Sequence, residues 1–248
     1  MKKSLLETFI KKYSLNGTVE SVKWNVTPTT KTLSTNAITE ERNVLIDVKY
    51  SNFDAITESA EIGIYETSKL SRMMSVLSDE INIVPNKKDE KITSLSFSDS
   101  NTDVQFITAD LTVIPASPNL KSSPTINAEI VLNDVFISKF IKAKNALQEV
   151  DTFTLLMNKG KKLELVLGYS KLNSNRITIA VETVGEKKEV SKNISFNAKY
   201  FKEILTANSD ADQSILQVSN AGLSTIHFKN DATGFSSSYY MVEVRSVD

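Results

Sequence analysis

One sequence unit recurs four times along the chain and constrains its fold more than any other feature. In its clearest copy, residues 130–147, a short apolar run ends at Asn133 and Asp134, and apolar pairs then begin at Phe136 and Phe140. This spacing predicts a helix with one apolar face, and Asn and Asp are typical N-cap residues. The unit therefore predicts a strand, a cap and an amphipathic helix. The basic front of that helix carries Lys139 and Lys142.

The other three copies repeat the apolar pairs of this helix. Aligned on the second apolar residue, the copies are Leu6, Leu70, Ile137 and Phe201, at successive separations of 64, 67 and 64 residues. A regular internal period indicates a repeated supersecondary unit. We expect four helices, at residues 5–13, 68–77, 134–147 and 198–208. We therefore predict an α+β fold of two similar domains, each with two helices packed on antiparallel sheets.

Runs of alternating apolar residues predict strands between and beside the helices. One predicted strand, 81–84, should stop at Pro85, and residues 86–91 should form a solvated hairpin loop. The other predicted strands are 22–26, 44–50, 61–65, 92–97, 104–108, 152–157, 163–169, 177–184, 194–197, 215–218, 223–228 and 239–244.

A linker with three prolines lies near the midpoint of the chain, at residues 111–124. Proline interrupts helices and internal strands, so this stretch marks a boundary. We predict an N-terminal domain at 1–111, an interdomain connector at 112–124 and a C-terminal domain at 125–248.

Composition excludes several classes of protein. The 248 residues, 40% of them hydrophobic, suffice for one or two domains with cores of their own. No cysteine is present, which removes disulfides, thiolate metal sites and cysteine nucleophiles. No apolar run reaches the ~18 residues of a membrane span, and Glu7 interrupts the apolar start that could pass for a signal peptide. These features fit a cytoplasmic protein, in the host cytoplasm if the source is viral.

Charge is distributed unevenly, although the net charge is only −1. The four helix windows, 2–13, 66–77, 134–147 and 198–208, hold eleven Lys and Arg against four Asp and Glu. They carry +7, and the rest of the chain carries −8. Lysines that merely solubilise helices would give a similar partition. The alternative interpretation is a set of basic helices on an otherwise acidic molecule.

The sequence shows little catalytic chemistry. The only histidine, His227, lies in a strand-like run opposite its neighbours Ile226 and Phe228, where a histidine is more often structural than catalytic. Gly-rich phosphate loops are absent, and one histidine without cysteine makes a poor zinc site. We expect no enzyme activity, no cofactor and no metal.

Two stretches resemble a known family. The run IGIY at 62–65, followed by Leu70 and by MMSVLSDE at 73–80, is similar to the corresponding part of DNA sliding clamps of the T-even phage type. The run SYYMV at 238–242 is similar to the last strand of both phage clamps and the proliferating-cell clamps. The repeated units, the basic helix fronts and the Pro-broken connector resemble the same family of polymerase processivity factors over essentially the whole chain.

This resemblance implies a homotrimeric ring around double-stranded DNA, which tethers a replicative DNA polymerase and is opened by a clamp loader. DNA would be bound without sequence specificity. The implied DNA-binding residues are Lys3, Lys11, Lys12, Lys69, Arg72, Lys139, Lys142, Lys144, Lys199 and Lys202. The implied partner-binding residues are Ile114 and Leu120 in the connector and Tyr240, Val242 and Val244 near the C-terminus.

Departures from the family pattern leave other interpretations open. The second helix has only Lys69 and Arg72, and the fourth has Glu203 where the third has Lys139, so the basic lining would be thinner there. Simple strand packing would also explain Tyr240 and Val242. The two alternative functions are a monomeric clamp-like processivity factor and a β-rich viral structural protein without a DNA role.

Overall fold

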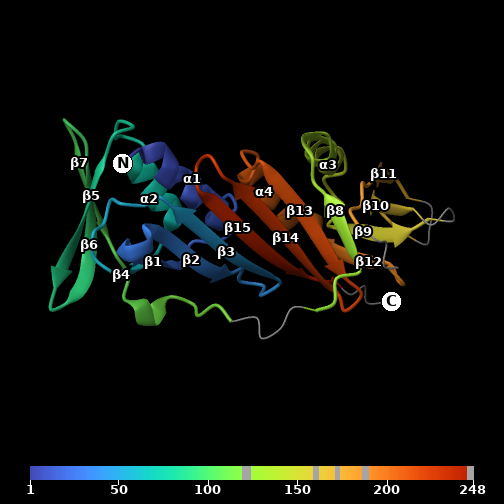
Figure 1. Cartoon of the computed structure of the whole chain (residues 1–248), viewed down its shortest axis with the longest axis horizontal. Coiled ribbons are helices and arrows are strands. Elements are labelled where there is room, and N and C mark those ends of the chain that lie inside the picture. Colours follow the sequence, from blue (N-terminus) through green and yellow to red (C-terminus); the bar gives the residue numbers. More distant parts are fainter. Residues whose placement is uncertain (119–123, 159–161, 171–173, 186–189, 245–248) are drawn as a thin grey trace. The chain divides into compact units, whose positions relative to one another are not determined.

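The computed structural model describes residues 1–118, 124–158, 162–170, 174–185 and 190–244. The chain forms two compact units (Figure 1). Unit 1 comprises Met1–Pro118 and Asn230–Ser237, and unit 2 comprises Asn119–Lys229 and Ser238–Asp248. The first part of the predicted connector thus belongs to unit 1, as does a short segment close to the C-terminus.

Unit 1 places two helices on antiparallel sheets. Four of its strands are neighbours in the order β4-β1-β2-β3, and a three-stranded sheet has the order β5-β6-β7. The elements are α1 (Lys3–Ser14), β1 (Val22–Thr27), β2 (Thr32–Ile38), β3 (Val44–Ser51), β4 (Ala60–Ile64), α2 (Thr67–Met74), β5 (Asn82–Lys88), β6 (Lys91–Ser98) and β7 (Asp103–Ile107). Two short 3-10 turns, η1 (Pro28–Thr30) and η2 (Leu111–Val113), complete it.

The core of unit 1 forms where the apolar face of α1 meets the sheet. Phe9 is packed edge-to-face on Tyr13 and on Trp24, with ring centroids 5.4 and 5.9 Å apart. All three side chains are buried. Such aromatic pairs add about 0.5–1.5 kcal/mol beyond the burial of their area. The sequence pattern that predicted the helix therefore also supplies the centre of this core.

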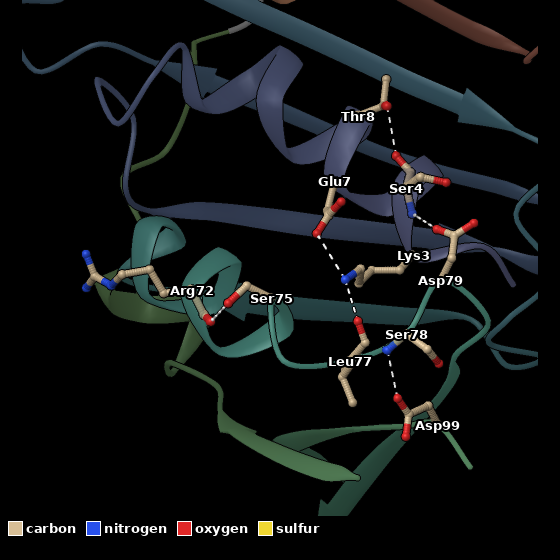
Figure 2. Close-up of polar contacts among 10 residues, drawn as sticks. All are labelled: Lys3, Ser4, Glu7, Thr8, Arg72, Ser75, Leu77, Ser78, Asp79 and Asp99. Atoms are coloured by element: carbon tan, nitrogen blue, oxygen red, sulfur yellow. Dashed lines mark hydrogen bonds and ion pairs between the residues drawn. The ribbon is translucent and has the colours of Figure 1, made fainter. Parts of the chain in front are cut away.

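Carboxylates distant in sequence cap both helices of unit 1. At the start of α1, Ser4 N donates to Asp79 Oδ1 at 2.9 Å (Figure 2). Lys3 N donates to the Asp79 carbonyl at 2.6 Å. The bond from the Ser4 amide lowers the pKa of Asp79. At the start of α2, Ser68 N donates to Glu20 Oε2 at 2.8 Å. Each helix start in unit 1 is thus tied to a distant segment.

Unit 2 repeats this plan. A four-stranded sheet has the order β11-β10-β9-β12, and four further strands are neighbours in the order β15-β14-β13-β8. The elements are β8 (Ala128–Val131), α3 (Asp134–Ala146), β9 (Thr152–Met157), β10 (Leu163–Leu167), β11 (Ile177–Ala180), β12 (Ile194–Asn197), α4 (Ala198–Ala207), β13 (Gln213–Ser219), β14 (Leu223–Asn230) and β15 (Phe235–Val242). The first residues of β15 belong to unit 1.

A buried aromatic cluster forms the core under α3 and α4. Phe140 contacts Phe201 and Phe153, with ring centroids 4.7 and 5.5 Å apart. The predicted cap residue Asn133 accepts a hydrogen bond from Phe136 N at 2.9 Å, and Asn197 accepts one from Tyr200 N at the same distance. Unlike those of unit 1, these two helices cap themselves.

The predicted α+β fold is confirmed, and all four predicted helices are present, but several bounds differ. Pro85 does not end its strand, because it lies in β5 opposite Leu95, and a proline is tolerated in an edge strand. The predicted loop at 86–91 shrinks to a turn at Asp89 and Glu90, both with positive φ. β2 was not predicted, α2 ends earlier than expected, and β15 begins earlier.

Candidate nucleic-acid interface and partner pocket

Exposed lysines of unit 2 lie on the helix faces that point away from the core. In α3, Phe136 and Phe140 are buried, whereas Lys139 and Lys142 are exposed. In α4, Lys199 is exposed and Lys202 is half-buried. Among the described residues, none of these four lysines has an ion-pair partner. Their ammonium groups are therefore available to an external anion.

Unit 1 presents a sparser basic surface on its helices. Lys11, Lys69 and Arg72 are exposed on α1 and α2. The Lys69 ammonium lies 3.1 Å from Glu66, and both side chains are about half exposed, so the pair is weak. The second helix thus presents two exposed basic side chains, one of them paired with a carboxylate.

Three of the predicted DNA-binding lysines do not lie on an exposed helix face, which corrects the expectation from the sequence. Lys12 is only 1% exposed, and its ammonium lies 5.5 Å from the ring centre of Phe235. Lys144 is 9% exposed and donates to the Gln148 carbonyl at 2.9 Å, near the end of α3. Lys3 donates to the Leu77 carbonyl at 2.5 Å (Figure 2). Each of these ammonium groups has an internal role.

The helices of each unit are in contact as pairs, α1 with α2 and α3 with α4. A pair of rigid helices with flexible lysines on its outer face offers diffuse attraction to phosphate groups without a fixed pattern of donors. Phosphate contacts of this kind position a nucleic acid but carry no sequence information. The arrangement suits binding of a duplex irrespective of its sequence.

A second candidate site is a pocket of about 100 Å³ in unit 2. Its lining residues come from strands β13, β14 and β15 and from the chain just before β8. Its lining residues are Pro124, Ile126, Gln217, Val218, Ser219, Leu223, Thr225, His227 and Tyr240. The pocket combines apolar walls with a few hydrogen-bonding groups, but it is smaller than the ~300–1,000 Å³ of most small-molecule sites.

The predicted partner-binding residues lie partly at this pocket. Tyr240 lines it, and Val242 and Val244 follow along the same terminal segment, 50% and 36% exposed. Ile114 is half-buried and ends η2 in unit 1. Leu120 lies outside the described residues. The structure thus brings Tyr240 to a cavity but does not place the connector residues at one.

Most of the pocket-lining residues, His227 above all, were not predicted as site residues from the sequence. Strand alternation puts Leu223, Thr225 and His227 on one face of β14, opposite the buried Ile226 and Phe228. That alternation was visible in the sequence and could have identified the face. The pairing of β14 with β13, which adds Gln217 opposite Thr225, could not be read from the pattern alone.

Within the described parts of the chain, no group of three or more His, Cys, Asp or Glu side chains could hold a metal ion. The described helices are also too short or too polar to cross a membrane.

No protein-family model matches the chain, and no curated protein matches it in sequence. Solved structures do match. One is the PCNA of A. fulgidus with the C-terminal region of FEN-1 bound, at a TM-score of 0.75 and 15% identity, covering 100% of this chain and 98% of that one. Another is proliferating cellular nuclear antigen from Entamoeba histolytica, at a TM-score of 0.72 and 16% identity, covering 98% and 96%.

The chain has the fold of a DNA sliding clamp. At this low identity the likeness lies in the fold, and it extends over both units. The clamp fold expected from the two short sequence stretches is therefore confirmed.

Proposed function

We propose that this protein is a sliding clamp, a non-catalytic processivity factor that encircles duplex DNA and tethers a replicative polymerase. The observation that carries the proposal is the set of basic side chains on the outward faces of helices in a clamp fold, among which Lys139, Lys142 and Lys199 are exposed and have no ion-pair partner among the described residues. It combines with the charge partition along the sequence, in which basic residues concentrate in the helix windows of a molecule with net charge −1.

A clamp must hold DNA without reading its sequence. Lysines neutralise phosphates and release counterions, an attraction that is sequence-independent and weakens with salt. Lys11, Lys69, Arg72, Lys139, Lys142, Lys199 and Lys202 form the proposed DNA surface. An excess of acidic residues elsewhere discourages DNA from binding outside this surface.

Unprotected strand edges support self-association into a ring. β5 and β7 are the edges of their sheet, but β5 carries Pro85, Lys87, Lys88 and a bulge, features that block edge pairing. β7 carries none of these, and its Ile107 is 69% exposed. In unit 2, β11 is likewise an edge. We propose that β7 of one copy pairs with β11 of the next, a head-to-tail contact that generates a closed ring.

The number of copies follows from the resemblance to two-domain clamps, which implies three. A closed ring also needs a loader to pass DNA through it, so a clamp loader is a proposed partner. The similarity of residues 62–80 to phage clamps supports a bacteriophage source and action in the host cytoplasm.

The pocket beside Tyr240 is the proposed docking site for the polymerase. The A. fulgidus protein is known with the C-terminal region of FEN-1 bound, and a short peptide segment of a partner would suit a pocket of this size. Ile114 and Leu120 of the connector, and Val242 and Val244 near the C-terminus, are further proposed partner-binding residues.

Two measurements on the wild-type chain test the proposal. Light scattering at tens of micromolar should give the mass of a trimer, and primer extension on a long template should give longer products when the chain is added to a polymerase of its source. A monomer that lengthens products would indicate the monomeric processivity factor. A chain with no effect on product length would indicate the structural protein.

A further inference from the structure

The only histidine of the chain is held in place in the wall of the unit 2 pocket. Nδ1 of His227 lies 2.9 Å from Oγ of Ser238 on β15, and strand pairing places Ile215 of β13 on its other side. A neutral imidazole offers one donor and one acceptor nitrogen. Because Nδ1 is engaged by Ser238, Nε2 is the ring nitrogen left for a molecule that enters the pocket.

The surroundings of the ring favour its neutral form. Burial lowers the pKa of His227 below its usual value, and the nearby Glu129 carboxylate opposes that shift. Glu129, on β8, accepts a hydrogen bond from Gln217 Nε2 at 2.9 Å. The other titratable groups on this sheet face are Tyr240 on β15 and Lys229, two residues further along β14.

The size and charge of the pocket restrict its occupant. A volume of about 100 Å³ equals that of about three liquid waters, enough for one aliphatic side chain. Ile126, Val218 and Leu223 provide apolar walls for it. No lysine or arginine is among the described lining residues, and Glu129 adds negative charge. An occupant with a carboxylate at this point would be repelled.

We propose that His227 is the specificity-determining residue of this pocket. Its neutral imidazole, held by Ser238, hydrogen-bonds through Nε2 to an uncharged polar group beside the apolar anchor of a partner's peptide segment. The inference rests on the proposed function only in assigning the pocket to a partner protein. The fold and the proposed DNA-binding role of the exposed lysines do not depend on this inference.

The sign of the pH dependence follows from this contact. An uncharged occupant covers the ring and increases the cost of charging it, so the pKa of His227 should fall further on binding. By linkage, binding of the occupant should weaken as the pH falls through the pKa that His227 has in the unbound protein. The loss of affinity is up to tenfold for each unit by which binding lowers that pKa. An anionic occupant would raise the pKa and reverse the sign.

Nuclear magnetic resonance of the single imidazole tests this in the full chain. The probes are N-acetyl-leucine methylamide, which is uncharged, and N-acetyl-leucine, which carries a carboxylate. At about pH 7.5 and millimolar concentration, the uncharged probe should shift the imidazole signals and lower the pKa of the ring, and it should bind more weakly at about pH 5. The carboxylate probe should bind more weakly than the uncharged one at the higher pH.

Two substitutions of His227 separate the effect of its hydrogen bond from the effect of its charge. Binding of the uncharged probe to each variant is measured from the backbone amide signals of Ser219 and Thr225. His227→Gln retains a hydrogen-bonding group that does not titrate, so binding should persist without pH dependence. His227→Phe retains bulk but not the bond, so binding should weaken at both pH values. Ser34→Ala, on the unit 1 sheet, should bind like the wild type, and each variant should keep a cooperative thermal transition.

Three results would overturn the inference. In the first, the uncharged probe leaves the imidazole signals unmoved. In the second, the carboxylate probe binds more tightly than the uncharged probe at the higher pH. In the third, His227→Phe binds the uncharged probe as tightly as the wild type does. The probes need neither DNA nor polymerase. Failure here would therefore leave ring formation and polymerase stimulation as separate questions, and failure of those would not affect this result.

Discussion

At the scale of single residues, two adjacent lysines of α1 have opposite roles. Lys11 is exposed at the end of the helix, whereas Lys12 is 1% exposed beneath the ring of Phe235. Helical spacing alone places Lys12 on the flank of the apolar face. The residue that covers it lies more than two hundred positions further along the chain, and no local pattern reveals such a contact.

Replacing each of these lysines by alanine should separate stability from DNA binding. Lys12→Ala removes a buried aliphatic stem and a cation over an aromatic ring, so it should lower the free energy of unfolding by about 2–4 kcal/mol. Lys11→Ala should change it by no more than about 0.5 kcal/mol and should weaken DNA binding instead. Chemical denaturation of both variants measures the first effect. Equal losses of stability would contradict the buried role of Lys12.

At the scale of elements, the basic face of α3 is the strongest candidate for binding DNA. Lys139→Ala combined with Lys142→Ala should reduce the slope of log affinity against log salt by about one for each phosphate that the variant no longer neutralises. Shorter primer-extension products should accompany this, most clearly at the higher of two salt concentrations. The trimer mass should not change.

A matched control is available in the strands of unit 1. Lys49 on β3 and Lys91 on β6 are also exposed, but neither lies on a helix. Lys49→Ala with Lys91→Ala removes the same charge, so it should leave product length unchanged. If the two double variants shortened the primer-extension products equally, the net charge of the protein rather than the α3 face would govern DNA binding.

The connector provides a second prediction at this scale. Ile114 is half-buried after η2, in the stretch that the sequence marks with prolines. Ile114→Ser with Leu120→Ser should weaken stimulation of the polymerase, because these apolar connector side chains are proposed to supply contact area to a partner segment. Trimer mass and the thermal transition should remain as in the wild type. Loss of the cooperative transition would show instead that these side chains belong to the core.

The elements also show what sequence patterns could and could not predict. Helical spacing located all four helices, and Asn133 and Asn197 cap two of them. β2 escaped detection because its buried face carries Thr35 between Leu33 and Ala37, which dilutes the alternation. Of the candidate site, the exposed lysines could be predicted from helical period. The pocket could not, because three paired strands and the segment at Ile126 build it together.

At the scale of the whole molecule, assembly decides between a clamp and its alternatives. The proposed ring depends on main-chain pairing of β7 with β11 of the next copy. Ile107, on β7, is 69% exposed in the single chain and would be covered by that pairing. Ile107→Asp adds a charge at the proposed contact, where burial without a partner is costly. The fold of each chain should survive, since the side chain points to solvent.

Ile107→Asp should therefore convert the trimer to monomer at concentrations where the wild type is associated, as measured by light scattering. DNA encirclement needs a closed ring, so the monomeric variant should also lose its effect on product length while its lysines remain intact. Val84→Asp on the protected edge β5 is the matched control, since Val84 is also exposed, at 52%, and it should leave the trimer unchanged. A trimer that withstands Ile107→Asp would place the subunit contact at another edge. A monomeric wild type that still lengthens products would favour an open clamp-like factor.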